Sequence, residues 1–409
     1  MGAEGPTFSW FVASLPEQKI NLASFGSIAF PISLVVEGPI IMLLAASTAL
    51  CKDIKSYYKL RKFTIILACA LTVIHVLIAF TPLYDWLVNS ILAVPKNLHE
   101  PGRLGLQILT PWTAAIAYRR FLQGVLIRFE RAHFIVIGTV IRLAVLIGCL
   151  KLFSTFTEFS GIAIGTIAIS AGVIAEAIFT HVVSRNTVKN AIPRTEETTE
   201  NLDLKSFLVF YIPLAVTPLM TLVIQPAGSA AMSRMPEVIN SLAAWQVVHA
   251  IIFLTRSIGF AFNEVVVAQS DKENAKNILN KFCLMLALFS SACLVILTLT
   301  PLAEYLLIQT YRLEQDLADV CKIALILGVT MPAYQAYQSL FQGRLVAAKK
   351  THGVTEAVAI YVALSLLGLL LGTHLSNIPG IYWAILTFSI AGIAQTLWLA
   401  LRAKEIRTL

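Results

Sequence analysis

The segment RNTVKNAIPRTEETTENLDLK (Arg185–Lys205) is the one long polar stretch in an otherwise apolar chain, and it lies close to the midpoint of the 409 residues. The sequence before it recurs after it, because a shift of 219 residues places FTPLYDWL (80–87) on LTPLAEYL (299–306) without a gap. The same shift aligns Lys62-Phe63 with Lys281-Phe282, Gln123-Gly124 with Gln342-Gly343, and His133 with His352. One register over such a distance predicts an internal duplication, with recurrent membrane-helix composition as the alternative.

The composition excludes a soluble globular domain. The chain is 57% hydrophobic and 13% charged, with a mean hydropathy of +0.77, whereas soluble domains are about 25% charged. We therefore expect a polytopic, integral membrane protein. The net charge of +8 would suggest nucleic acid as the partner of a soluble protein. Here it reflects basic loops, and we expect membrane lipid and no nucleic acid as partners.

No pattern typical of an enzyme or a bound metal is present. The six cysteines have no paired spacing, and the sequence contains no zinc-protease, nucleophile-elbow or phosphate-loop motif. Neither a ring of like residues nor a re-entrant filter, as a channel needs, is visible. The first residues lack a signal-peptide pattern. We expect a non-enzyme without cofactor or metal.

Apolar runs of about twenty residues, enough to cross a bilayer, define the expected helices. They lie at 22–50, 62–93, 103–128, 132–154, 159–184, 204–233, 238–269, 277–308, 316–345, 352–374 and 379–402. This predicts an all-α fold of about eleven transmembrane helices in two repeated lobes. The lobes are 1–184 and 206–409, with a linker at 185–205. The helices are numbered 2–6 in the first lobe and 7–12 in the second, as in a twelve-helix repeat whose first helix is missing. Under the repeat, the counterpart of helix 7 falls mostly before residue 1, so the first lobe is expected to lack helix 1.

Lysine and arginine in short loops predict the orientation, because loops rich in these residues stay in the cytoplasm. One set of alternate loops, which includes the linker and the C-terminal tail, holds twenty of them, whereas the other set holds six. The linker and the C-terminus are therefore expected on the cytoplasmic side of a plasma or inner membrane.

Once the basic residues counted in the loops are set aside, five remain, all inside expected helices: Arg119, Arg120, Arg142, Arg256 and Lys322. A charge at a helix centre costs roughly 2.5–3.5 kcal/mol on insertion scales, so such residues usually face a partner or a watered cavity. Arginine suits carboxylate and phosphate because its planar fork donates two parallel hydrogen bonds. The basic interior therefore favours an anionic substrate. In the alternative, Arg119 or Arg120 extends to the cytoplasmic surface and Arg142 pairs with Glu176.

One helix carries a polar and aromatic stripe. Gln246, His249, Arg256 and Asn263 share a face, with Phe253 and Phe260 between them. Such a stripe favours the lining of a cleft, and interhelical hydrogen bonding is the alternative. With Gln123 on another helix, these residues complete the expected binding set.

The repeat pairs Glu37 with Arg256, an acid with a base. Equivalent positions in two repeats lie at similar depth, so we hypothesise an ion pair between the lobes that gates transport, with a pair inside one lobe as the alternative. Pro39 beside Glu37, and Pro218 in helix 7, are candidate bending points because proline removes a backbone donor. Glu176 and His181 are candidates for proton transfer or, alternatively, part of a solvated edge.

The chain resembles the multidrug/oligosaccharidyl-lipid/polysaccharide (MOP) flippase superfamily. The resemblance rests on two halves joined by a cytoplasmic linker, proline-containing helices 2 and 7, and the stretches FLQG (121–124) and LFQG (340–343) before basic loops. It implies a MATE-like twelve-helix fold whose lobes rock about a central cavity to give alternating access.

Three branches of that superfamily are compared. The multidrug and toxin extrusion (MATE) branch uses acidic residues in helices 1, 7 and 10, yet 207–232 contains no acid and helix 10 offers glutamines. The lipid II flippase branch keeps arginines in its cavity, and Arg256 occupies a similar place, although Glu37 stands where an arginine is expected. The progressive ankylosis (ANK) branch, associated with pyrophosphate and small anions, is resembled at Gly38-Pro39 and Gly124-x-Leu126.

We expect a monomeric alternating-access transporter or flippase that exports a lipid-linked saccharide or a small anion, with H⁺ or Na⁺ as a candidate coupling ion. The alternatives are a cation-coupled multidrug antiporter and a membrane scaffold that transports nothing.

Overall fold

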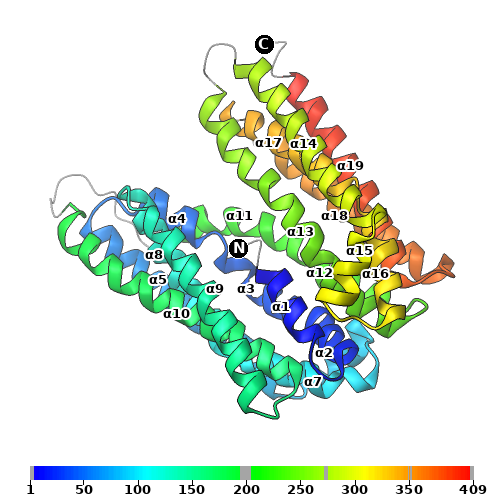
Figure 1. Cartoon of the computed structure of the whole chain (residues 1–409). Coiled ribbons are helices and arrows are strands. Elements are labelled where there is room, and N and C mark those ends of the chain that lie inside the picture. The colour runs from blue at the N-terminus through cyan, green and yellow to red at the C-terminus, as the bar shows by residue number, and fades with distance from the viewer. Residues whose placement is uncertain (1–3, 194–203, 271–274, 349, 351, 406–409) are drawn as a thin grey trace. The chain divides into compact units, whose positions relative to one another are not determined.

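The structure is a computed structural model, and it describes residues 4–193, 204–270, 275–348, 350 and 352–405. All regular elements in these ranges are helical, as predicted (Figure 1). Nine helices of the described chain are long and apolar enough to cross a membrane. They match nine of the eleven predicted spans and establish an integral, multi-pass membrane protein. The other two predicted spans are broken, into α7 and α8 and into α11 and α12.

Helix boundaries follow local chemistry more closely than the apolar runs do. α5 (Ile54–Phe80) begins eight residues before its predicted start because Asp53 and Ser56 form a capping box. The helix ends at Phe80, and the extended backbone of Thr81 leads into Pro82. α14 (Ala275–Leu299) likewise ends two residues before a proline, Pro301. Both predicted spans continued about ten residues too far, because the residues after these prolines are also apolar.

The 219-residue register extends to the backbone of each half. α9 (His133–Phe156) and α18 (His352–Leu375) coincide at both ends after the shift. The elements after α5 and α14 also correspond: α6 (Leu83–Trp86) and η3 (Leu87–Leu92) match α15 (Leu302–Glu304) and η5 (Tyr305–Thr310). The residues that follow, Ala93 and Arg312, both have a positive φ angle and are also 219 positions apart. The internal repeat is therefore a repeat of structure.

The remaining elements correspond in the same order. α1 (Glu4–Ala13) matches α12 (Ile224–Met232). The pair α7 (His99–Ile108) and α8 (Thr110–Arg128) matches α16 (Gln315–Leu327) and α17 (Met331–Ala347), and α10 (Gly161–Asn190) matches α19 (Gly380–Glu405). α13 (Val238–Gln269) is one continuous helix. Its counterpart is divided into α2 (Gln18–Ser24), η1 (Phe25–Ala29), α3 (Phe30–Glu37), η2 (Gly38–Ile40) and α4 (Leu43–Leu50).

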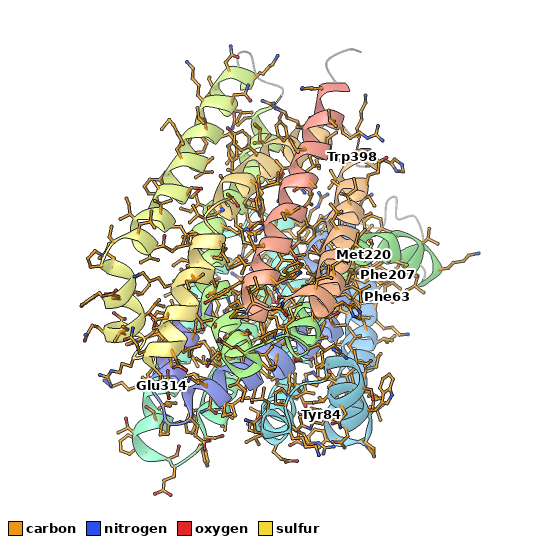
Figure 2. The ribbon with its side chains drawn as sticks, turned by 90° about the vertical axis from the view of Figure 1, so that its right-hand side faces the viewer. Phe63, Tyr84, Phe207, Met220, Glu314 and Trp398 are labelled. Atoms are coloured by element: carbon orange, nitrogen blue, oxygen red, sulfur yellow. The ribbon has the colours of Figure 1, made fainter. Side chains whose placement is uncertain are left out.

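The chain forms two compact units. Unit 1 comprises Met1–Ser27, Leu92–Leu98 and Ile224–Leu409, and unit 2 comprises Ile28–Ile91 and His99–Val223. α11 (Leu204–Leu222) thus belongs to unit 2, where Phe207 stacks on Phe63 of α5 with ring centroids 4.8 Å apart (Figure 2). The lobes 1–184 and 206–409 stay predictions. α10 continues six residues into the predicted linker, and 194–203 of that linker lie outside the described residues.

Gly124 lets α8 approach α4 closely, and this generates a test of the packing. A Cβ at this position would overlap the Leu44 carbonyl oxygen and Ser47 Oγ, and the first is backbone that cannot rotate away. At the repeat-equivalent Gly343 the nearest atoms belong to the Val266 side chain, at 2.7 Å. We expect Gly124→Ala to cost about 1–3 kcal/mol of stability and Gly343→Ala less.

Thermal unfolding of the purified protein in detergent measures these differences. Gly148→Ala is the matched control, since a Cβ there has nothing within 4 Å, and it should leave the unfolding temperature unchanged or raised. A control variant as unstable as Gly124→Ala would refute the packing argument.

Candidate functional site

A buried carboxylate joins three helices of unit 2. Glu176 of α10 is 0% exposed. Its Oε2 accepts a hydrogen bond from Arg119 Nη1 of α8 at 2.5 Å and lies 3.5 Å from Arg142 Nη1 of α9. Its Oε1 accepts a hydrogen bond from Gln123 Nε2, one turn after Arg119, at 3.1 Å. We call Glu176, Arg119, Arg142 and Gln123 the Glu176 cluster.

The helices can meet there because glycine stands at the crossing of α9 and α10. A Cβ on Gly172 would lie 2.9 Å from the carbonyl oxygen of Arg142. The close approach brings the Arg142 side chain to the carboxylate. The pairing of Arg142 with Glu176, left open by the sequence, is therefore present, and Arg119 does not extend to the surface. Whether these residues also contact substrate stays a prediction.

The equivalent place in unit 1 is uncharged. Under the repeat, Arg119 corresponds to Gln338 and Glu176 to Gln395. Gln338 Nε2 donates to Gln395 Oε1 at 3.0 Å and to the Gly392 carbonyl oxygen at 3.1 Å. The two halves thus place the same contact between equivalent helices, as a charged cluster in one and as an amide pair in the other.

Arg256 of α13 has only neutral partners among the described residues. Its Nη2 donates to Gln335 Oε1 of α17 at 2.6 Å, and its guanidinium lies over the rings of Phe260 and Tyr334 at 5.5 and 5.4 Å. Its Nε is buried without an acceptor. The charge is held in place by π faces and one amide, and no carboxylate of the described chain neutralises it.

The predicted stripe on α13 is a continuous set of contacts in unit 1. The rings of His249, Phe253 and Phe260 follow one another with centroids 6.2 and 5.8 Å apart. Gln246 donates to Ser9 Oγ of α1 at 3.3 Å, and His249 is hydrogen-bonded to Gln225 of α12. The interhelical alternative therefore describes these two residues. Asn263, near the end of the helix, is half-buried.

One predicted bending point, Pro39, lies at a break in regular helix, whereas Pro218 lies inside α11, four residues before that helix ends. Pro39 is in the 3₁₀ turn η2, and its carbonyl oxygen accepts a hydrogen bond from the Tyr211 hydroxyl of α11. Pro218 lies in the last turn and a half of α11, which ends at Leu222 before α12 begins. A gating role for Pro39, Pro218 and the Glu37–Arg256 pair stays a prediction.

The other sequence candidates have local partners. Lys322 pairs with Glu304 at 3.3 Å. His181 Nδ1 is hydrogen-bonded to the Tyr118 hydroxyl, and Arg185 donates to its Nε2. Within the described ranges no group of His, Cys, Asp or Glu has the arrangement of a metal site.

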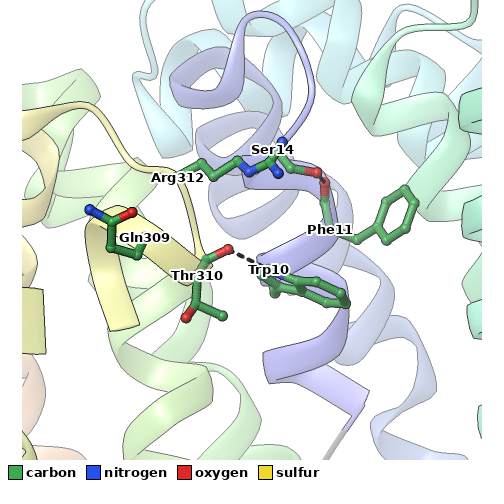
Figure 3. Close-up of a pocket in the computed structure, with 6 residues that line it drawn as sticks. All are labelled: Trp10, Phe11, Ser14, Gln309, Thr310 and Arg312. Carbon is green, nitrogen blue, oxygen red and sulfur yellow. Dashed lines mark hydrogen bonds between the residues drawn. The ribbon is translucent and has the colours of Figure 1, made fainter. Parts of the chain in front are cut away.

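A pocket of about 270 Å³ in unit 1 was not foreseen from the sequence. It lies between the end of α1 and the end of η5, and is lined by Trp10, Phe11, Ser14, Gln309, Thr310 and Arg312 (Figure 3). Trp10 Nε1 donates to the Thr310 carbonyl oxygen at 2.6 Å. None of the predicted binding residues lines this pocket, so it is separate from the basic interior.

From the sequence, only the pairing of Arg142 with Glu176 was considered, as an alternative, among the contacts of the Glu176 cluster. The signal that would have added Arg119 and Gln123 is their spacing of one helical turn, which puts both on one face. A second signal is that the residues equivalent to Arg119 and Glu176 under the repeat, Gln338 and Gln395, are both polar inside apolar helices.

Comparison with solved structures identifies the fold. An inward-facing conformation of a multidrug resistance MATE family transporter of the MOP superfamily is similar with a TM-score of 0.78 and 14% identity, covering 100% of this chain and 96% of that one. Lipid II flippase MurJ in an inward closed conformation gives 0.69 and 15%, covering 98% and 87%. A MOP superfamily transporter from Pyrococcus furiosus, described as having a binding pocket of reverse polarity that suggests a different function, gives a TM-score of 0.58 and 12% identity, covering 99% of this chain and 96% of that one.

No protein-family model and no curated protein sequence matches the chain significantly. These structures confirm the predicted MATE-like fold, which is the fold of the MOP superfamily members among them.

In the Glu176 cluster, removal of the acid is expected to cost more stability than removal of one arginine. Glu176→Gln leaves two buried arginines without their carboxylate and should cost about 3–5 kcal/mol, since breaking a buried pair strands a charge. Arg119→Gln should cost less, because Glu176 keeps its ion pair with Arg142 and its hydrogen bond from Gln123. The double variant Arg119→Gln/Glu176→Gln should be more stable than Glu176→Gln alone, since Gln338 and Gln395 show that an amide pair fits this crossing.

Unfolding temperatures of the four proteins form a double-mutant cycle. Glu158→Gln, at an exposed position of the same unit, is the control for loss of a carboxylate. Simple additivity of the two single changes would exclude the pairing.

Proposed function

We propose that the chain is a membrane transporter of the MOP superfamily that binds an anionic group in its interior and moves its substrate across the bilayer by alternating access. The fold supports transport, because the similar structures include a multidrug resistance transporter and a lipid II flippase over nearly the whole chain. Identities of 14 and 15% carry the fold alone. The substrate class is therefore argued from the residues of this chain.

The observation that carries the anionic assignment is Arg256. A membrane-buried guanidinium is costly unless it is paired, and this one is held by neutral groups with its Nε unused. A phosphate or carboxylate on the remaining edge of the fork would supply both the missing hydrogen bonds and the missing charge. A cationic drug would be repelled from the same place.

The substrate has two sources of the same chemistry, a small anion such as pyrophosphate and the pyrophosphate of a lipid-linked saccharide. The exposed aromatic face next to Arg256, formed by Phe253 and Phe260, favours a substrate that also carries an apolar part. We propose export with the C-terminus in the cytoplasm, on the basis of the basic loops.

Transport by proteoliposomes tests the proposal. The panel holds pyrophosphate, citrate, an undecaprenyl-linked sugar and a cationic dye, and the proteins are the wild type, Arg256→Ala and Arg256→Lys. We expect movement of an anion or of the lipid-linked sugar, with apparent affinity falling about ten- to hundredfold in Arg256→Ala, because a charge-assisted hydrogen bond contributes about 1.5–3 kcal/mol. Arg256→Lys should retain part of the affinity, since it keeps the charge and loses the fork.

Lys322→Ala is the control, because it removes one positive charge from a helix interior where Glu304 already neutralises it. Dye movement that is indifferent to Arg256 would refute the anionic proposal and favour a cation-coupled antiporter. Failure of the wild type to move any member of the panel would favour a scaffold.

A further inference from the structure

The pocket of about 270 Å³ between the end of α1 and the end of η5 lies within unit 1 (Figure 3). The indole of Trp10 forms part of its wall and is fixed by the hydrogen bond from Nε1 to the Thr310 carbonyl oxygen, at 2.6 Å. The Tyr311 hydroxyl also donates to the Pro6 carbonyl oxygen, at 3.2 Å. Two segments that lie 300 residues apart in the chain are thus bonded to each other, so the walls of the pocket are held by contacts of the protein itself.

Arg312 gives the pocket its charge. It is the one charged residue among the six that line the pocket, and its side chain extends toward Ser14 (Figure 3). Its backbone carbonyl oxygen accepts a hydrogen bond from Gln18 Nε2 at 3.4 Å, whereas its guanidinium has no acceptor and no ion pair among the described residues. An unpaired guanidinium favours an anionic ligand, because an anion supplies both the acceptors and the opposite charge.

The acids that follow Arg312 in the chain are neutralised by another residue. Lys19 of α2 pairs with Glu314 at 2.8 Å and with Asp316 at 2.5 Å. Asn240 of α13 also donates a hydrogen bond to Asp316, at 3.4 Å. Neither acid lines the pocket, so the positive charge of Arg312 is left for a ligand.

The internal repeat separates the chemistry of this pocket from the backbone that carries it. Under the shift of 219 residues, Trp10 corresponds to Ser229 and Arg312 to Ala93. Ala93 and Arg312 have nearly the same φ, 51° and 55°. The two halves therefore share the turn, and the indole and the guanidinium are particular to the half that has the pocket. Ala93 also shows that alanine adopts this backbone conformation.

The exposed residues beside the pocket place it at the level of lipid headgroups. α14 is 25 residues long, about 37 Å at 1.5 Å per residue, which is enough to cross a hydrocarbon core of about 30 Å. Its last residue, Leu299, and Tyr305 of η5 are exposed, as is Trp86, the repeat equivalent of Tyr305. Tyrosine and tryptophan gather at membrane–water interfaces, and the basic loops predict that this interface is the outer one.

We propose that this pocket binds the headgroup phosphate of an anionic phospholipid from the outer leaflet, with the phosphate on Arg312 and the glycerol against Trp10. A guanidinium suits phosphate because its planar fork donates two parallel hydrogen bonds. A cavity of about 270 Å³ accepts a headgroup and is small for a drug-sized ligand. An anionic lipid is favoured over a zwitterionic one, since no acid lines the pocket to hold an ammonium group.

The lipid site goes beyond the proposed function, because it shares no residue with the predicted binding set around Arg256. A phospholipid held there would contact both α1 and the segment that follows η5. Its binding would therefore stabilise the contact that Trp10 and Thr310 already make.

Photo-crosslinking of the protein in phosphatidylcholine nanodiscs tests the site. Two probes are added in trace amounts, phosphatidylglycerol and phosphatidylcholine, each with a photoactivatable group next to its glycerol. The readout is the yield of lipid adduct on the peptides that contain Trp10 and Thr310, determined by mass spectrometry. For the wild type we expect about tenfold more adduct from phosphatidylglycerol. Soluble glycerol 3-phosphate should leave that yield unchanged, because the membrane concentrates the lipid and not the soluble anion.

Variants of Arg312 separate the charge from the shape of the guanidinium. Arg312→Ala should lower the yield from phosphatidylglycerol about tenfold, since a charge-assisted hydrogen bond is lost. Arg312→Lys should keep part of the yield, since it keeps the charge and loses the fork. Lys151→Ala removes an exposed basic residue near the end of α9 and should label as the wild type does. Arg312→Ala should also unfold at the wild-type temperature in lipid-free detergent, because its guanidinium bonds to no described residue.

The outcomes test each part of the inference. An unchanged yield in Arg312→Ala would overturn the site, and equal yields from the two probes would overturn the preference for an anionic lipid. Loss of labelling on addition of glycerol 3-phosphate would assign the pocket to a soluble phosphate and overturn the lipid source. A fall in Lys151→Ala as large as that in Arg312→Ala would show that general surface charge attracts the lipid. All of these outcomes leave transport through Arg256 as a separate question.

Discussion

The shared use of one carboxylate, Glu176, is the interaction on which the arrangement of unit 2 depends. Two arginines and a glutamine from neighbouring helices converge on it in a region closed to water. In such an environment a lone charge is prohibitive, and a charge with well-placed donors is tolerated. The cluster therefore fixes the mutual rotation of α8, α9 and α10.

The two halves have the same backbone arrangement but differ in the charge of the side chains at equivalent helix contacts. Equivalent helices keep the same register and even the same left-handed turn residues, yet the contact between equivalent helices is ionic in unit 2 and an amide pair in unit 1. Arg120 in unit 2 and Arg256 in unit 1 both lie inside helices and make no ion pair with a carboxylate of the described chain. An interior that is basic in both units is consistent with a substrate that brings negative charge with it.

Much of the fold follows from the sequence because the bilayer imposes a simple rule, that backbone polar groups must be bonded within each segment. Apolar runs therefore marked most helices, and the repeat marked their order. The ends were less well predicted: Asp53 starts α5 within a charged stretch, and Pro82 ends it within an apolar one. Hydropathy identifies the segments that are apolar enough to cross the membrane, whereas capping residues and prolines determine where the helical hydrogen bonding begins and ends.

The candidate site was predicted by residue type and only partly by partner. Charges inside apolar helices singled out Arg119, Arg120, Arg142 and Arg256 because such charges are rare. Which of them is neutralised depends on how neighbouring helices are rotated, and no spacing within one helix contains that information. Close approaches at Gly172 and Gly38 set those rotations, and a glycine in the sequence does not show which helix it will meet.

The Glu176 cluster also constrains how the protein is made. Each of α8, α9 and α10 carries a charge that is unfavourable in lipid by several kcal/mol when alone, and Glu176 belongs to the last of the three to leave the ribosome. Arg119 and Arg142 therefore have to remain near the insertion machinery, or near water, until α10 arrives. The equivalent crossing in the second half, built on Gln338 and Gln395, carries no such charge and leaves those helices freer to enter the bilayer one after another.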